Sequence, residues 1–145
     1  DMYTQTGATI LGCQKVPKEK VSSYGIVAGE PTINEQLMKV SDMIEKPSIE
    51  EAPSQMAVLG RYIITPDVFE VLQNTKPGKG GEIQLTDALK VMAKRENVYA
   101  YNFTGKRYDV GDKLGFLKAT VEFALRRDDL SADFSSYLKD IVKDL

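Results

Sequence analysis

Strand-like and helix-like segments alternate along most of this chain, and that alternation limits the fold more than any other feature. Runs of apolar and β-branched residues predict strands at 8–16, 37–44, 56–64 and 97–103. An apolar stripe at helical spacing precedes the last of these runs and comprises Leu85, Ala88, Leu89, Met92 and Ala93. Because helices that separate strands must cover a sheet, this order predicts a layered α/β fold.

Glycine and proline predict where several elements begin and end. The opening DMYTQTG is typical of the tail of a helix, with Gly7 just past its last residue. Since a domain seldom starts inside a helix, we expect the chain to be a fragment of a longer protein. AGEP, at 28–31, predicts a turn between two short strands. A helix is expected to start at Thr65 as its cap, with Pro66 at the first position and Asp67 facing the dipole.

The C-terminal third predicts a small β-hairpin followed by two helices. TGKRY is expected to turn the chain into a second short strand that ends at Asp109. The two helices are then expected to present apolar stripes, which comprise Leu114, Leu117, Val121 and Leu125 on the first, and Phe134, Leu138, Ile141 and Leu145 on the second. A pair of helices of this kind fits a homo-oligomer.

Composition removes several classes of function. The 145 residues suffice for a single domain with a sizeable core. The chain has no histidine, which excludes Ser-His-Asp and Cys-His catalysis and the commonest zinc sites. A net charge of −2 provides no basic field for nucleic acid, and no apolar run approaches the roughly 20 residues that cross a bilayer. Cys13, the single cysteine, excludes an internal disulfide and favours a reducing, cytoplasmic location.

Glu45 and Lys46 form an acid–base pair where a predicted strand ends. Pro47 follows them and stops any further ladder pairing, because proline has no N–H to donate. A carboxylate accepts hydrogen bonds from vicinal sugar hydroxyls, and an ammonium group suits a phosphate. The pair therefore fits a sugar phosphate, although a charged, solvated strand exit explains the same residues.

Three other positions are candidates for chemistry. Asp109 comes at the end of the predicted short strand, where ligands of α/β sheets collect, and one carboxylate there can hold Mg²⁺. A turn or capping aspartate is the alternative. Gly25 and Gly60 would let a ligand approach the backbone, or they belong to a turn and a bulge. The loop KPGKGGE lacks the P-loop spacing, so we interpret it as a flexible loop.

Taken together, these segments resemble the second half of the bacterial UTP–glucose-1-phosphate uridylyltransferases, also called UDP-glucose pyrophosphorylases. The segments that carry the resemblance are YGIV, MIEKP, EEAPS, AVLGRYIITPDVF, TKPGKGGEIQLTDAL and GKRYDVGDKLGFLKATVEFALR, and they span nearly the whole chain. The resemblance implies part of a doubly wound, Rossmann-like nucleotidyltransferase sheet. It also implies that residues 1–145 form a single domain, the sugar-phosphate-binding half, without the N-terminal nucleotide-binding half.

The resemblance assigns a role to each candidate residue. Glu45 would bind the glucose hydroxyls and Lys46 the phosphate of glucose 1-phosphate, while Gly25 and Gly60 would line the sugar pocket. Asp109 would be a ligand of Mg²⁺. UTP and glucose 1-phosphate would react by in-line attack to give UDP-glucose and pyrophosphate, chemistry that depends on positioning and charge neutralisation.

Two rival functions remain open from the sequence. The same sugar phosphate serves thymidylyl- and adenylyltransferases, and the base is chosen in the absent half. A non-catalytic sugar-phosphate-binding or oligomerisation module that uses the C-terminal helices is the rival from another class.

Overall fold

The computed structural model describes residues 1–143. They fall into two compact units, Asp1–Thr104 and Gly105–Leu145, which we call the barrel unit and the C-terminal unit and describe separately. Leu145, expected on the last helix, lies outside the described residues. The prediction of one domain over 1–145 stays a prediction.

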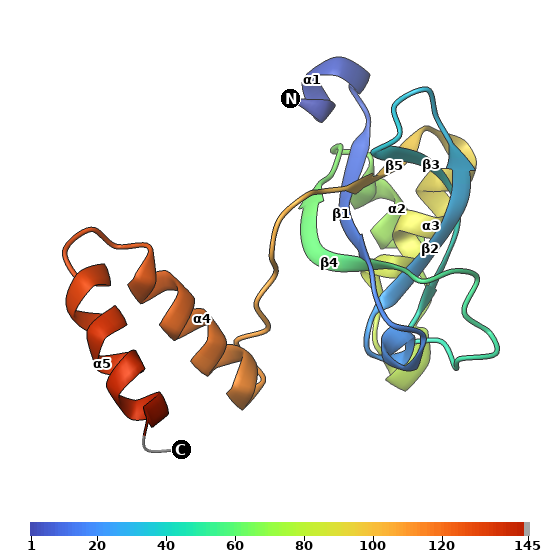
Figure 1. Ribbon diagram of the computed structural model, residues 1–145. Coiled ribbons are helices and arrows are strands. Elements are labelled where there is room, and N and C mark those ends of the chain that lie inside the picture. Colours follow the sequence, from blue (N-terminus) through green and yellow to red (C-terminus); the bar gives the residue numbers. More distant parts are fainter. Residues whose placement is uncertain (144–145) are drawn as a thin grey trace. The chain divides into compact units, whose positions relative to one another are not determined.

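The barrel unit is built on five strands that close into a ring (Figure 1). The strands pair in the order β1-β4-β2-β3-β5, and β5 returns to β1. Only β1 and β5 pair in parallel; the other neighbours are antiparallel. The strands are β1 (Thr9–Lys15), β2 (Gly25–Pro31), β3 (Leu37–Glu45), β4 (Met56–Ile63) and β5 (Val98–Asn102).

The barrel unit also contains helices, of which α2 (Val68–Asn74) and α3 (Leu85–Arg95) pack against the sheet. The others are α1 (Met2–Thr6) and the 3-10 helices η1 (Lys18–Ser23) and η2 (Lys79–Gly81). The structure confirms the predicted stripe of α3, because Ala88, Leu89 and Met92 are at most 1% exposed and join one core cluster with Leu11 and Met43 from the sheet. α3 contacts β3, β5 and α2, so it is the element that ties the strands to the helical layer (Figure 1).

The predicted turn at AGEP is wrong, because β2 runs through it. The β2–β3 register shifts between Ala28 and Gly29, which marks a bulge. A Cβ at Gly29 would lie only 2.0 Å from the carbonyl oxygen of Lys39, so only glycine permits this close approach. The glycine that suggested a turn therefore keeps the strand paired.

The cap predicted for the helix after β4 is also wrong. The N-cap of α2 is Asp67, and α2 begins at Val68. Thr65 is buried, and its hydroxyl lies 3.2 Å from that of Thr9 on β1, whose Oγ1 also accepts the Thr65 amide at 3.1 Å. A tertiary hydrogen bond has replaced the local cap.

The C-terminal unit contains two helices, α4 (Lys113–Leu125) and α5 (Ser131–Lys143). Asp112 caps α4 by accepting a hydrogen bond from the Gly115 amide at 2.7 Å. The hairpin expected before α4 is wrong: within residues 1–143, β5 is the last strand, and 103–112 forms an irregular segment (Figure 1). Its side chains instead bond to α4, as described in the Discussion.

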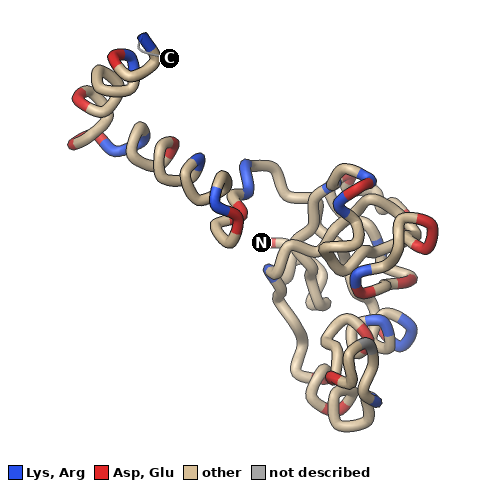
Figure 2. The backbone as a smooth tube through the Cα atoms, turned by 90° about the horizontal axis from the view of Figure 1, so that it is seen from below, with Lys and Arg blue, Asp and Glu red and all other residues tan. Residues whose placement is uncertain are grey.

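The mixed α/β fold is confirmed, and so is the helix that ends at Gly7, whose φ of 63° is the left-handed conformation of a C-cap. Acidic and basic residues are interspersed along the backbone of each unit (Figure 2). Over residues 1–143, no helix has both the length and the apolar character needed to cross a bilayer.

Candidate functional site

Glu45 and Lys46 lie where β3 leaves the barrel. In the antiparallel register of β2 and β3, Glu45 is opposite Gly25, and the Lys46 amide donates to the Tyr24 carbonyl at 3.0 Å. Strand pairing therefore fixes the position at which the acid and the base emerge, and it brings Gly25 beside them. Glu45 is half-buried and Lys46 is exposed.

The backbone at Lys46 is strained. Its φ is 44°, and among residues 1–143 no other non-glycine residue has a positive φ. Adjacent side chains on an extended strand point to opposite faces, and the left-handed conformation interrupts that alternation directly after Glu45. Strain of this kind concentrates at ligand-binding sites, so it favours a binding site over a simple solvated strand exit.

The carboxylate of Glu45 is held between β2 and α3. The hydroxyl of Thr86, the second residue of α3, donates to Oε2 of Glu45 at 2.5 Å. A Cβ at Gly25 on β2 would lie 2.9 Å from the same oxygen and 3.4 Å from the Thr86 hydroxyl. The predicted residues Gly25 and Glu45 thus meet in one cluster, with a third member that sequence reasoning missed.

Tyr62 on β4 is a second residue that the sequence did not single out. Tyr62 is 40% exposed, and partial burial raises the pKa of its phenol, which the negative charge of Glu45 raises further. The signal in the sequence was the position of Tyr62 inside VLGRY, two residues after Gly60.

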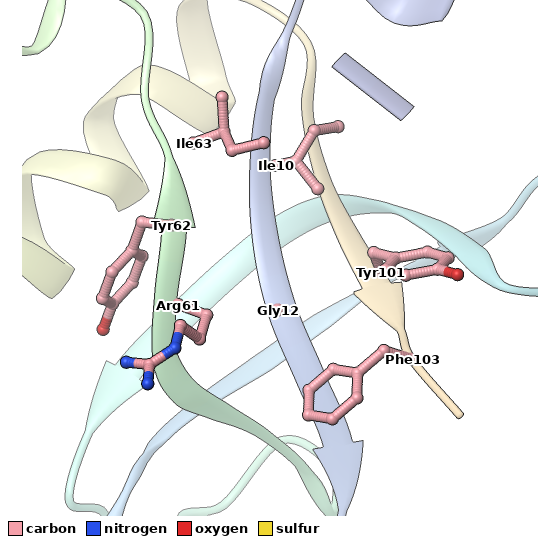
Figure 3. Close-up of a pocket in the computed structure, with 7 residues that line it drawn as sticks. All are labelled: Ile10, Gly12, Arg61, Tyr62, Ile63, Tyr101 and Phe103. Carbon is pink, nitrogen blue, oxygen red and sulfur yellow. The ribbon is translucent and has the colours of Figure 1, made fainter. Parts of the chain in front are cut away.

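Tyr62 also borders an open groove on the outside of the barrel, with a cavity volume of about 370 Å³. Figure 3 shows Arg61 and Tyr62 on β4 to one side of β1, and Tyr101 and Phe103 on the other side. Ile10, Gly12 and Ile63 complete the lining. None of the five predicted site residues lines this groove, so the acid–base pair and the groove are separate features.

Gly60 occupies a bulge of β4. The β1–β4 register jumps between Gly12 and Cys13, whose partners are Arg61 and Val58, so two residues of β4 stand outside the ladder. Gly60 has a φ of 69°, and a Cβ built there would meet nothing within 4 Å. The glycine is therefore required by backbone conformation, and its place in a sugar pocket stays a prediction.

Gly25, Glu45 and Lys46 lie together in the barrel unit, and Asp109 belongs to the C-terminal unit, within which it is described. Its carboxylate lies 3.2 Å from the Arg107 guanidinium and accepts the Gly111 amide at 3.2 Å. A Cβ at Gly115 would lie 2.0 Å from the Asp109 carbonyl oxygen, so glycine lets the first turn of α4 approach this backbone closely.

The fit of Asp109 to a metal ion follows from its surroundings. Half of its side chain is exposed, and over residues 1–143 no group of three His, Cys, Asp or Glu side chains could hold a metal ion. Mg²⁺ commonly takes only one or two protein carboxylates and completes its shell with water and substrate phosphates. Asp109 therefore fits as a single ligand, and not as part of a closed metal cage.

Comparison with known protein families identifies the family of this chain. The nucleotidyl transferase family model matches residues 2–125. This chain belongs to the nucleotidyl transferase family. The match confirms the family that the sequence motifs suggested.

Curated relatives of this nucleotidyl transferase chain are named UTP–glucose-1-phosphate uridylyltransferase. One from Staphylococcus saprophyticus is 46% identical over 143 residues, which are 99% of this chain and 50% of the relative. Another, from Streptococcus pneumoniae, is 42% identical over 145 residues, which are 100% of this chain and 48% of the relative. The chain thus spans about half the length of the curated relatives it matches.

Solved structures agree with the sequence comparison. A UDP-glucose pyrophosphorylase complexed with UDP-glucose has a TM-score of 0.81 at 47% identity, covering 87% of this chain and 47% of that one. A UTP-bound enzyme from Acinetobacter baumannii has a TM-score of 0.80 at 33% identity, covering 94% and 47%. A putative glucose-1-phosphate thymidylyltransferase from Bacillus anthracis reaches only 0.62 at 26% identity, covering 88% and 47%. The nucleotidyltransferase fold is confirmed.

Proposed function

We propose that this chain is the sugar-phosphate-binding half of a UTP–glucose-1-phosphate uridylyltransferase, which makes UDP-glucose and pyrophosphate from UTP and glucose 1-phosphate. The observation that carries the proposal is the exit of β3, where Glu45 is held beside Gly25 and Lys46 adopts a strained backbone. The names of the relatives and the higher TM-scores of UDP-glucose enzymes favour uridylyl transfer over the thymidylyl alternative.

In this proposal, the two charged residues at the end of β3 bind different parts of glucose 1-phosphate. Glu45 accepts hydrogen bonds from glucose hydroxyls, while Lys46 binds the phosphate and orients its oxygen for in-line attack on the α-phosphorus of UTP. Gly25 leaves room beside the carboxylate, and the Gly60 backbone lines the sugar pocket. No covalent intermediate with the protein is needed, which agrees with a chain that has no histidine.

Asp109 would hold a divalent metal ion, for which we propose Mg²⁺. When bound, the ion neutralises charge on the phosphates. Asp109 itself contributes a carboxylate oxygen, and the Arg107 and Gly111 contacts orient that carboxylate. Asp109→Asn, tested in a chain extended to the full length of the relatives, should lower kcat about 100-fold or more, as is typical for loss of transition-state charge stabilisation. Parental activity at limiting Mg²⁺ would refute the metal role.

Ligand binding to the 145-residue chain tests the sugar-phosphate site directly. Glucose 1-phosphate should bind more tightly than glucose or inorganic phosphate, because it engages both Glu45 and Lys46. Lys46→Ala should abolish the advantage that the phosphate gives, and Glu45→Gln should abolish the advantage that the sugar gives. Equal binding of all three compounds, or no binding, would contradict the proposed site.

Activity measurements test the division of labour between halves. The chain alone should form almost no UDP-glucose, and a protein extended by the N-terminal half should form it. In that protein, Glu45→Gln should mainly raise KM for glucose 1-phosphate, whereas Lys46→Ala should lower kcat as well, because its charge acts on the attacking phosphate. Efficient UDP-glucose formation by the 145-residue chain would overturn this division.

Location and assembly stay predictions. We propose a cytoplasmic enzyme that forms a homo-oligomer, on the basis of the single cysteine and the paired helices α4 and α5. Cys13 is buried, and burial raises its pKa to about 12, so it is no reactive thiol.

A further inference from the structure

We infer that Thr86 is a positioning residue that fixes which oxygen of Glu45 meets a sugar hydroxyl. The inference rests on the proposed function, and it adds a residue that works through Glu45 and not through direct contact with the phosphates.

The hydrogen bond between the two side chains has one possible direction. Glu45, when ionised, can only accept, so the Thr86 hydroxyl donates its proton to Oε2 over 2.5 Å. The partners are 41 residues apart in sequence and come from different elements, β3 and α3. The contact is therefore tertiary and exists only when α3 is docked on the sheet.

Thr86 is well suited to hold a ligand-binding side chain in place. It is 8% exposed, and it lies directly before the residues through which α3 enters the core, Ala88, Leu89 and Met92. A side chain anchored on a rigid, packed element defines geometry better than one on a loop. The hydrogen bond from Thr86 thus restricts the Glu45 carboxylate, because Thr86 itself is fixed by the packed helix α3.

Gly25 on β2 also lies close to the same oxygen. A Cβ there would come within 2.9 Å of Oε2, so the space around that oxygen is filled by the β2 backbone and the threonine hydroxyl. The hydrogen bond from Thr86 occupies Oε2 of the Glu45 carboxylate. Oε1 is therefore the oxygen that is left to accept a hydroxyl of the sugar.

Thr86→Val and Thr86→Ser separate positioning from packing. Valine keeps the shape of threonine and removes the hydroxyl, whereas serine keeps the hydroxyl and removes the methyl group. Thr65→Val is the matched control, because Thr65 is equally buried at 8% and its hydroxyl contacts Thr9 and not Glu45. Any effect shared by both valine variants reflects the loss of a buried hydroxyl alone.

The first measurement needs no ligand. Three-bond NMR couplings of the Glu45 side chain should report one rotamer in the parent 145-residue chain and in Thr86→Ser, and averaged rotamers in Thr86→Val. The Thr65→Val variant should match the parent. Averaged couplings already present in the parent, or a single rotamer retained in Thr86→Val, would overturn the inference whether or not the chain binds a sugar phosphate.

The second measurement is the Kd of glucose 1-phosphate and of inorganic phosphate. Thr86→Val should raise the Kd of glucose 1-phosphate about tenfold, the scale of one weakened hydrogen bond, and leave that of phosphate unchanged. Thr86→Ser should restore affinity to within about twofold. A chain that binds no glucose 1-phosphate would refute the proposed function, whereas equal binding by parent and Thr86→Val would refute only the role of Thr86.

Discussion

Glu45 in the barrel unit is held by a threonine that is anchored in a hydrophobic core, whereas Asp109 in the C-terminal unit is held by an arginine and a backbone amide on an open segment. The partner of Glu45 is 8% exposed, while the side chain of Arg107 is 31% exposed and that of Asp109 is 50% exposed. The packed core therefore holds the Glu45 side chain in place, whereas the position of Asp109 depends on contacts that water and salt weaken.

The two units also differ in how they use apolar side chains. The barrel unit has a core of fully buried apolar side chains, among which Leu11, Met43 and Leu89 are at most 2% exposed. In the described part of the C-terminal unit, the only buried hydrophobic residue is Ala119, and Leu117 is 58% exposed. Hydrophobic burial thus stabilises the barrel far more than it stabilises the helical pair.

Polar and aromatic contacts replace that burial in the C-terminal unit. The Tyr108 hydroxyl donates to Glu122 on α4 at 2.5 Å, Arg126 donates to the Tyr108 hydroxyl at 2.8 Å, and Lys106 pairs with Glu122. The rings of Tyr108 and Phe123 lie 5.6 Å apart. This network, which we call the Glu122 network, ties the segment before Asp109 to α4 and explains why the segment forms no strand.

Leucine truncation should expose the largest difference between the units. Leu89→Ala should lower the free energy of unfolding of the barrel by about 2–5 kcal/mol, because it leaves a cavity in a packed core. Leu117→Ala, on the exposed face of α4, should change it by less than about 0.5 kcal/mol. Urea unfolding of both variants measures the contrast. Equal losses would show that α4 is buried in solution, for example against another copy of the chain.

The same contrast explains how far the sequence alone could lead. The stripe of α3 was predictable because helical periodicity records which face is buried. Glu45 and Lys46 could be proposed from the sequence because an acid and a base stand side by side at a strand exit. The closed ring of strands, by contrast, depends on pairing between distant segments, such as β1 with β5, which local pattern does not record.

The residues that sequence reasoning missed share this non-local origin. Thr86 is a functional candidate only because it reaches Glu45 across 41 positions, and Tyr62 only because β4 carries it near that carboxylate. The hairpin predicted at TGKRY is wrong for a similar reason: Tyr108 bonds to Glu122 on α4, a contact that the local sequence pattern does not record. The turn predicted at AGEP is wrong because a glycine in a β-bulge and a glycine in a turn give the same local sequence pattern.

Alkaline pH should weaken the barrel through Cys13. Burial raises the pKa of this thiol from 9.0 to about 12, so between these values the folded chain binds more protons than the unfolded chain. The stabilisation is complete below pH 9 and is lost as pH rises, by about 2 kcal/mol between pH 9 and pH 10.5. Urea unfolding across this range gives the slope.

Cys13→Ala is the matched control for the alkaline slope. The pKa of Tyr62 is also raised and lowers stability at high pH in the same direction, but it does so in both proteins. Cys13 is the last of the three causes of the Tyr62 shift, after burial and Glu45, so the difference in slope between parent and variant reports the thiol together with this smaller effect on Tyr62. Parallel slopes would show that Cys13 ionises as easily in the folded chain as in the unfolded chain.

The bulge at Gly60 should show a smaller and purely conformational effect in the barrel. Gly60→Ala should cost about 1–2 kcal/mol because an L-residue resists a φ of 69°, although no atom lies within 4 Å of the added Cβ. Gly60→Asn should cost less, since asparagine tolerates the left-handed region. Thermal melting of both variants measures this order. An alanine variant as stable as the parent would mean that the bulge relaxes to an ordinary strand.

Acid should produce the smallest effect, and in the C-terminal unit it should act on the Glu122 network. Hydrogen bonds from Lys106 first, and then from Tyr108, hold the pKa of Glu122 below its usual 4.5. A lowered pKa means that the stabilisation is present above pH 4.5 and is lost as pH falls through the folded value. The Glu122 network should therefore loosen in acid, and the Gly111 amide, which bonds to Asp109, should exchange faster with solvent.

Glu122→Gln should reproduce this loosening at neutral pH, and it is the sharper test. In the barrel unit, Lys90 lowers the pKa of Asp42 too, so acid alone also weakens a barrel contact, whereas the substitution leaves that pair intact. We expect faster amide exchange at Gly111 and altered Tyr108 ring shifts, with Leu89 and its neighbours unchanged. If the variant instead accelerated exchange in α3 as much as at Gly111, Asp109 would be tied to the barrel core, and the contrast between the two candidate sites would not hold.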